Sequence, residues 1–176
     1  LVPKKGCVHL IRAFAQVVTR HPEAELVVVG DGFLRERLEA LAREQRLPVR
    51  FLGGLSSEGV RQQMAMARVF CLPSIRAPNG DAEGLPITLL EAQACGVPVV
   101  TSAHGGATEG LIDGEIGFAF SEGDENQLAE RLAQLLTDDG LLARMSLAAR
   151  EFVVKRFDLT ECTHQLEEFY DDFCAR

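Results

Sequence analysis

The sequence predicts an α/β fold: a Rossmann-like three-layer domain with a parallel sheet flanked by helices, followed by a C-terminal helical tail. Over residues 1–123, short apolar runs alternate with amphipathic helical segments. The apolar runs lack polar alternation, which is typical of strands buried on both faces. After Gly123 only helical patterns remain. We therefore expect one domain, with an α/β core over 1–123 and a helical tail over 124–176.

The core elements are expected in strict alternation. The helices share apolar residues at helical spacing, and several have Ser, Pro or Gly at an end; they cover residues 6–20, 33–46, 56–67, 86–95 and 108–112. The strands share runs of Val, Leu or Phe; they cover residues 26–29, 49–53, 69–73, 97–101 and 117–120. This order implies right-handed crossovers and one parallel sheet.

The tail is expected to contain three helices, over residues 126–137, 140–157 and 159 to the C-terminus. Its apolar stripe should not form a separate core. We expect it to cover the edge of the sheet or a partner domain.

Composition narrows the classes of function. Hydrophobic residues make up 47% and charged residues 25% of the chain, as in soluble globular proteins. The net charge of −8 disfavours nucleic acid as a partner, although local cations and helix N-termini can still bind a small anion. Five cysteines without a C-x-x-C pair and no membrane-length apolar run lead us to expect a cytoplasmic protein. Neither a metal site nor a cofactor is expected.

Two carboxylates draw attention to the segment that follows the strand at 69–73. Ligands of open parallel sheets bind beyond the carboxyl ends of the strands, and a long polar loop leads from there to Glu83. Glu91 follows eight positions later, about two helical turns away. Two such carboxylates could hold different hydroxyls of one elongated ligand. The alternative is that Glu83 merely stabilises a helix start and Glu91 is an ordinary surface acid.

The residues next to Glu83 favour a binding role. Gly84 permits close backbone approach, and Pro86 is expected to begin a helix. Glu83 should then lie at the helix N-terminus, where the amides of Gly84 and Leu85 favour an anionic or hydroxyl-rich ligand.

The segment from Glu83 to Val100, EGLPITLLEAQACGVPVV, resembles the E-x7-E segment of the group 1 glycosyltransferases, glycosyltransferase family 4 of the GT-B superfamily. The resemblance implies that Glu83 contacts the donor sugar and that Glu91 contacts the ribose hydroxyls of the nucleotide. Lys4-Lys5-Gly6 is similar to the first loop of that family, which gives Lys5 the role of neutralising the donor diphosphate. The family usually has an Arg about five residues earlier, a position that precedes Leu1. Taken alone, the two lysines could be merely solvated.

Three further segments fit the same resemblance. Gly30 and Gly32 flank Asp31 after a buried strand, where a diphosphate or base could approach the backbone, although a tight turn would look the same. Gly53 ends a segment whose counterpart in the family packs on the nucleotide base. His104 lies in a loop that resembles the family's Gly-Gly-x-Pro-Glu segment; it could be a general base, but a lone loop His is more often structural or solvated.

The resemblance implies the C-terminal, donor-binding domain of a retaining glycosyltransferase. That enzyme would transfer a hexose from a nucleotide-diphosphate sugar to a hydroxyl of a polysaccharide, glycolipid or similar glycan, with Glu83 and Lys5 at the reacting end. An N-terminal acceptor-binding domain would be absent from residues 1–176, any membrane contact would belong to that domain, and this chain alone is expected to be inactive. Two alternatives stay open: a nucleotide-sugar epimerase of the GT-B fold, and a non-catalytic Rossmann-like interaction domain.

Overall fold

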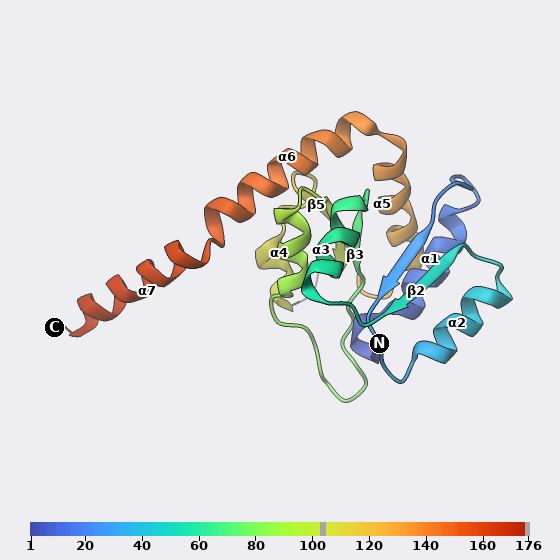
Figure 1. Ribbon diagram of the computed structural model, residues 1–176, viewed down its shortest axis with the longest axis horizontal. Helices are drawn as coiled ribbons and strands as arrows, with labels where there is room; N and C mark the ends of the chain where they lie inside the picture. Colours follow the sequence, from blue (N-terminus) through green and yellow to red (C-terminus); the bar gives the residue numbers. More distant parts are fainter. Residues whose placement is uncertain (103–104, 175–176) are drawn as a thin grey trace.

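The computed structural model describes residues 1–102 and 105–174, and its elements alternate as expected (Figure 1). The strands are β1 (Leu26–Val29), β2 (Val49–Gly53), β3 (Phe70–Leu72), β4 (Val99–Ser102) and β5 (Gly117–Phe120). The α-helices are α1 (Cys7–Val17), α2 (Arg35–Glu44), α3 (Ser57–Met66), α4 (Ile87–Ala94), α5 (Glu125–Thr137), α6 (Asp139–Arg156) and α7 (Leu159–Cys174). Two 3-10 helices complete the list, η1 (Pro3–Lys5) and η2 (Gly105–Gly110).

All strand pairs are parallel, but the strands form two sheets rather than the single sheet expected. One sheet pairs β1 with β2, and the other has the order β3-β4-β5. Within the described residues, no strand pairing joins the two sheets. The alternation of strands and helices was therefore sufficient to predict that the strands are parallel. It was not sufficient to predict which strands pair.

The first residues of the chain lie between the loops that leave the two sheets. At one side, the amide of Leu34 donates to the carbonyl of Leu1 (3.3 Å), just after β1. At the other side, the amide of Ile75 donates to the carbonyl of Lys4 (2.8 Å), just after β3. Residues 1–6 therefore connect the carboxyl ends of the two sheets. No strand-to-strand hydrogen bonds join these sheets within the described residues.

Helices cover both faces of the three-stranded sheet, which gives the expected three layers. Neighbouring residues of β4 point to opposite faces, as the period of a strand requires. Val99 packs in a cluster with Leu89 of α4 and Met64 of α3. Val100 packs in the main cluster with residues of α1 and α5, including Phe14. All four residues of β4 are buried, including the polar Thr101 and Ser102, whose hydroxyls donate to backbone carbonyls, as expected of a strand covered on both faces.

Helix ends follow local sequence signals. Ser56 caps α3 by accepting a hydrogen bond from the amide of Gly59, and Asp124 caps α5 by accepting from the amides of Asn126 and Gln127. Asp138 likewise caps α6. These caps place each helix start within one or two residues of the expected position.

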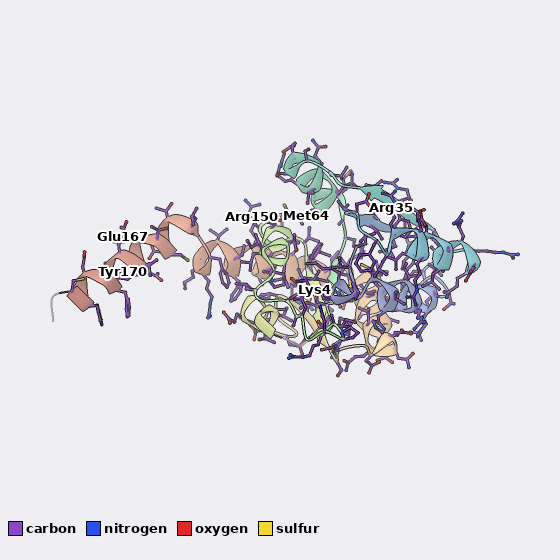
Figure 2. All side chains as sticks on the ribbon, turned by 90° about the horizontal axis from the view of Figure 1, so that it is seen from below. Lys4, Arg35, Met64, Arg150, Glu167 and Tyr170 are labelled. Atoms are coloured by element: carbon purple, nitrogen blue, oxygen red, sulfur yellow. The ribbon has the colours of Figure 1, made fainter. Side chains whose placement is uncertain are left out.

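The tail divides into a packed part and a projecting part. Leu128 and Leu135 of α5 are fully buried in the main core cluster, so the first tail helix covers the sheet as expected. By contrast, α7 extends clear of the rest of the chain, with Glu167 and Tyr170 on its projecting part (Figures 1 and 2). Five large apolar side chains of α7 are more than half exposed: Leu159, Leu166, Phe169, Tyr170 and Phe173. The stripe of α7 therefore does not cover the sheet edge, and for this helix the other expected role, covering a partner domain, stays a prediction.

The five cysteines are free thiols. Burial raises the pKa of the Cys71 thiol far above its usual value, which suits a structural rather than a reactive cysteine. Across residues 1–102 and 105–174, no helix combines the length and apolar character needed to cross a membrane.

We predict that Gly6→Ala destabilises the protein strongly. Gly6 has φ +60°, and a Cβ atom there would overlap the carbonyl oxygen of Pro73. The backbone strain costs about 1–2 kcal/mol, and the overlap should bring the total loss in the free energy of unfolding to about 3 kcal/mol or more. Urea unfolding followed by circular dichroism measures the loss.

Gly80→Ala is the matched control, because Gly80 also has a positive φ (+85°) but has open space around its Cβ position. It should lose only about 1–2 kcal/mol. Equal losses for the two variants would mean that the Gly6–Pro73 contact does not hold the two segments together.

Candidate functional site

The carboxyl ends of β3 and β4 carry the first cluster of predicted site residues. Three segments meet there: the turn from η1 into α1, the long loop 73–86, and η2. Gly6 allows the first turn to lie directly on Pro73, and the hydroxyl of Ser102 donates to the carbonyl of Ser74 (2.6 Å). These contacts fix the start of loop 73–86 from two sides.

An ion pair joins the first turn to the far end of the loop. Nζ of Lys5 lies 3.0 Å from Oε1 of Glu83, whose side chain is only 12% exposed. Nζ of Lys4 lies 3.1 Å from Oδ2 of Asp81 and 4.0 Å from Oε1 of Glu83. The structure therefore brings together Lys5 and Glu83, which are far apart in the sequence.

Oε1 of Glu83 is a buried acceptor without a hydrogen-bond donor among the described residues. The 3.0 Å between Oε1 and Nζ of Lys5 is short enough for a hydrogen bond, but the angles between the two groups do not suit one. The contact is therefore a coulombic attraction between opposite charges. Buried carboxylate oxygens are normally satisfied by donors. An unsatisfied one beside a cation is a position where a ligand hydroxyl could donate.

The backbone of η2 packs closely against the segment that carries Glu83. A Cβ atom at Gly105 would lie 2.6 Å from the carbonyl oxygen of Glu83. A Cβ atom at Gly106 would lie 2.5 Å from the amide nitrogen of Leu85 and 2.6 Å from the carbonyl carbon of Gly84. Only residues without a side chain permit this approach. The resemblance to the family's Gly-Gly-x-Pro-Glu segment pointed to this glycine pair but not to its contact with Glu83.

The start of α4 differs from the expectation. Pro86 is the N-cap with extended backbone (ψ 114°), α4 begins at Ile87, and its first turn contains no acid. The residue before a proline is disfavoured in the helical conformation, so Leu85 and Gly84 belong to the loop. Glu83 therefore lies ahead of the helix rather than in its first turn, and the amides of Gly84 and Leu85 are loop amides. Its position depends on Lys5 and η2, not on the helix dipole.

Glu91 lies in the middle of α4 and is exposed. Its carboxylate has no ion pair or side-chain hydrogen bond to any residue that the structure describes. Glu91 and Glu83 thus differ in environment, one free in solvent and the other nearly buried beside a lysine. The structure leaves the carboxylate of Glu91 available to a ligand.

The second cluster of predicted residues lies at the carboxyl ends of β1 and β2. The amide of Gly30 donates to the carbonyl of Gly53 (2.7 Å), which joins the two loops. Gly53 has φ +72° and Gly32 lies against the backbone of Leu1, so both positions require glycine. The structure therefore brings Gly30 and Gly53 together and ties Gly32 to the start of the chain.

Sequence reasoning missed the charged network around this second cluster. The guanidinium of Arg35 donates to Oδ2 of Asp31 (3.0 Å) and to the carbonyl of Phe51 (3.3 Å). The amide of Gly32, and then Arg35, hold the pKa of Asp31 below its usual value. The i, i+4 spacing of Asp31 and Arg35 was the available signal. Arg35 thus braces both loops through one side chain.

Other candidates contribute less. His104 lies outside the described residues. Among the residues that the structure does describe, no group of three or more His, Cys, Asp or Glu could hold a metal ion. An open hollow of about 570 Å³ is lined by residues of α1, α5 and their ends: Arg20, His21, Glu130, Ala133, Gln134, Thr137 and Asp138. This hollow lies at the carboxyl ends of α1 and α5. These helices lead away from the carboxyl ends of the strands, where ligands of parallel sheets bind, so the hollow is not at the expected ligand position.

Comparison with known proteins gives close relatives. Over 154 residues the chain is 40% identical to a GDP-mannose-dependent monoacylated alpha-(1-6)-phosphatidylinositol monomannoside mannosyltransferase from Corynebacterium glutamicum; the match covers 87% of this chain and 40% of that protein. It is 34% identical over 169 residues to a putative colanic acid biosynthesis glycosyltransferase, WcaL, of Salmonella typhimurium, covering 94% and 42%. The chain thus spans less than half the length of these relatives.

Solved structures agree. A crystal structure of Anabaena Alr3699/HepE in complex with UDP-glucose superposes with a TM-score of 0.85 at 28% identity, covering 98% of this chain and 46% of that one. The C-terminal domain of a group 1 glycosyl transferase, LpcC, from Francisella tularensis matches with a TM-score of 0.81 at 20% identity, covering 90% and 83%. The family model of the glycosyl transferases group 1 matches residues 1–152. This chain therefore belongs to the group 1 glycosyl transferase family and has the fold of GT-B glycosyltransferases.

Proposed function

We propose that residues 1–176 bind a nucleotide-diphosphate sugar and form the donor-binding domain of a retaining hexosyltransferase that acts on an acceptor hydroxyl of a glycan. The observation that carries this proposal is the Lys5–Glu83 pair. A cation and a buried carboxylate oxygen without a donor lie side by side. The cation suits the diphosphate of the ligand, and the carboxylate oxygen suits a hydroxyl of its sugar.

Charge explains how the pair would receive the donor. The Lys5 side chain is 36% exposed, so solvent and ligands can reach it. A diphosphate carries more negative charge than one carboxylate and would attract Lys5 more strongly. Once Lys5 turns to the diphosphate, Glu83 is free to accept hydrogen bonds from sugar hydroxyls.

In the reaction, the main task is to stabilise the departing diphosphate. Lys5 and backbone amides of the surrounding loops would supply that electrostatic stabilisation. Glu83 would orient the sugar rather than attack it. The bond between the anomeric carbon and the diphosphate oxygen would break, the acceptor oxygen would bond to the anomeric carbon, and the hydroxyl proton would pass to the departing diphosphate. The resemblance to E-x7-E enzymes implies retention of configuration.

The remaining predicted residues would hold the nucleotide. Glu91 presents a free carboxylate that suits the two ribose hydroxyls. Gly30, Gly32 and Gly53 line the joined loops after β1 and β2, where a base or diphosphate could lie against bare backbone. Relatives are described with GDP-mannose and with UDP-glucose, so the base remains a choice for experiment.

The acceptor would be bound by a further domain. The chain corresponds to 40% of the Corynebacterium mannosyltransferase, which leaves room for a second domain in an enzyme of that length. The exposed apolar stripe of α7 would then pack against that remainder.

We predict that the purified chain binds at least one of UDP, GDP and ADP with a dissociation constant below about 1 mM. Isothermal titration calorimetry, with circular dichroism to show that the protein is folded, measures this. The absence of binding to all three nucleotides in a folded sample would exclude the proposal.

The variant Glu91→Ala should bind that nucleotide about tenfold more weakly than the wild-type chain does, because it lacks the charge-assisted hydrogen bonds to ribose. Glu44→Ala is the control, as Glu44 is an exposed acid at the C-terminal end of α2, away from the proposed site. Unchanged affinity in Glu91→Ala would favour the alternative in which the acids are structural and the domain only mediates interactions.

A second prediction concerns turnover. The chain alone should transfer no sugar above background, because the acceptor-binding part and the additional arginine that the resemblance implies are not among its residues. Release of nucleotide diphosphate, measured with a coupled assay and glycolipid acceptors, tests this; robust release would contradict it. Incubation with a nucleotide-sugar and no acceptor, followed by NMR, would detect epimerisation and so support the epimerase alternative.

A further inference from the structure

We propose that Gln93 is a positioning residue that holds Glu83 in place for the donor sugar by anchoring η2. The inference rests on the proposed function, in which Glu83 contacts the sugar. Gln93 makes no contact with the proposed ligand itself.

The environment of Gln93 is unusual for an amide. It lies on the buried side of α4, two residues after the exposed Glu91, and its side chain is fully buried. Nε2 donates to the carbonyl of Gly110 (2.9 Å), while Oε1 is buried without a donor among the described residues. A buried unsatisfied acceptor destabilises the fold. An apolar side chain at position 93 would avoid this cost. We therefore infer that the amide is present because its hydrogen bond fixes Gly110.

Gly110 is the last residue of η2, and its surroundings show how closely this end is packed. A Cβ atom at Gly110 would lie 2.9 Å from a methyl group of Leu89 and 3.2 Å from one of Leu85. A six-residue 3-10 helix has poor internal hydrogen-bond geometry and depends on such external contacts. The hydrogen bond from Gln93 therefore fixes η2 to α4 at its end.

At its beginning, η2 lies against the site. Gly105 and Gly106 contact the backbone of Glu83, Gly84 and Leu85 without intervening side chains. The contacts from Gln93 to Gly110, along η2, and from Gly105 to the Glu83 carbonyl form a continuous series.

Among the described residues, the other polar contacts near Glu83 come from the lysines of η1, Lys5 to Glu83 itself and Lys4 to Asp81. The hydroxyl of Ser102 fixes the loop at Ser74, nine residues earlier. The Lys5 contact is the one that a diphosphate would compete for. With the donor bound, η2 would remain as the main support of the Glu83 backbone.

The expected consequence is selective. Lys5 belongs to η1, a different segment, so loss of the Gln93 hydrogen bond should leave diphosphate binding nearly intact. The contribution of the sugar to affinity should fall, since it depends on the placement of Glu83.

The test compares the wild-type chain with Gln93→Met, which keeps the size of the side chain but removes the donor. The probes are UDP with UDP-glucose and GDP with GDP-mannose, titrated by calorimetry. The isolated C-terminal domain of the Francisella relative has been crystallised, so a domain of this kind folds on its own. We expect the nucleotide-sugar to bind about five- to tenfold more weakly to the variant, and the nucleotide diphosphate to change by less than about twofold.

Ser146→Ala is the matched control. Its hydroxyl donates to the carbonyl of Gly96 (2.5 Å), so the variant removes a hydrogen bond at the same end of α4 that does not involve η2. It should lower stability without changing the ratio of the two affinities. An unchanged ratio in Gln93→Met would overturn the proposal, as would an equal change in Ser146→Ala. If Gln93→Met does not fold, Gln93→Asn, which keeps the amide but is one methylene shorter, decides by the same ratio.

Hydrogen–deuterium exchange separates this inference from the proposed function, because it needs no ligand. In Gln93→Met, amides of residues 105–110 and 83–85 should exchange faster relative to those of α5. If the wild-type chain binds no nucleotide, the proposed function fails while exchange still reports on the anchor. Unchanged exchange in both segments would show that Gln93 does not hold η2.

Discussion

The close approach of Gly6 to Pro73 is the contact on which the arrangement of the candidate site depends. It joins the start of the chain to the end of β3, and so brings the lysines of η1 beside loop 73–86. Lys5 can reach Glu83 only because the backbone at Gly6 has a positive φ and no side chain. The same use of bare backbone recurs at η2, where a glycine pair lies on the segment that carries Glu83.

The charges at the site bear on the proposal that this acidic protein binds an anion. The chain has a net charge of −8, yet two lysines gather at the carboxyl edge of the strands. Each is paired with a carboxylate, Lys4 with Asp81 and Lys5 with Glu83. A diphosphate would enter by exchanging partners with these ion pairs, so the resting site need not keep an unpaired cation. The buried acceptor of Glu83 then finds its donor in the sugar.

Much of this could be predicted from the sequence, because it depends on local patterns. Uninterrupted apolar runs and helical spacing were enough to predict the alternating elements. The position of Glu83 after a strand indicated a binding role, whereas Lys5 was predicted from the family resemblance. What could not be predicted depends on contacts between distant segments. The break between β1–β2 and β3–β5 and the packing of η2 on Glu83 both follow from backbone contacts that leave no periodic trace. The projection of α7 is of the same kind, since its apolar stripe was visible but its partner was not.

Binding of the donor diphosphate at the Lys5–Glu83 pair is tested most directly by the affinity of Lys5→Met for the nucleotide diphosphate that the wild-type chain binds. Lys155→Met, at the exposed end of α6, serves as the control. Loss of a charge-assisted contact to the diphosphate should weaken binding by about tenfold or more in Lys5→Met and leave the control unchanged. Equal affinities for Lys5→Met and wild type, in folded samples, would show that the diphosphate does not bind at the Lys5–Glu83 pair.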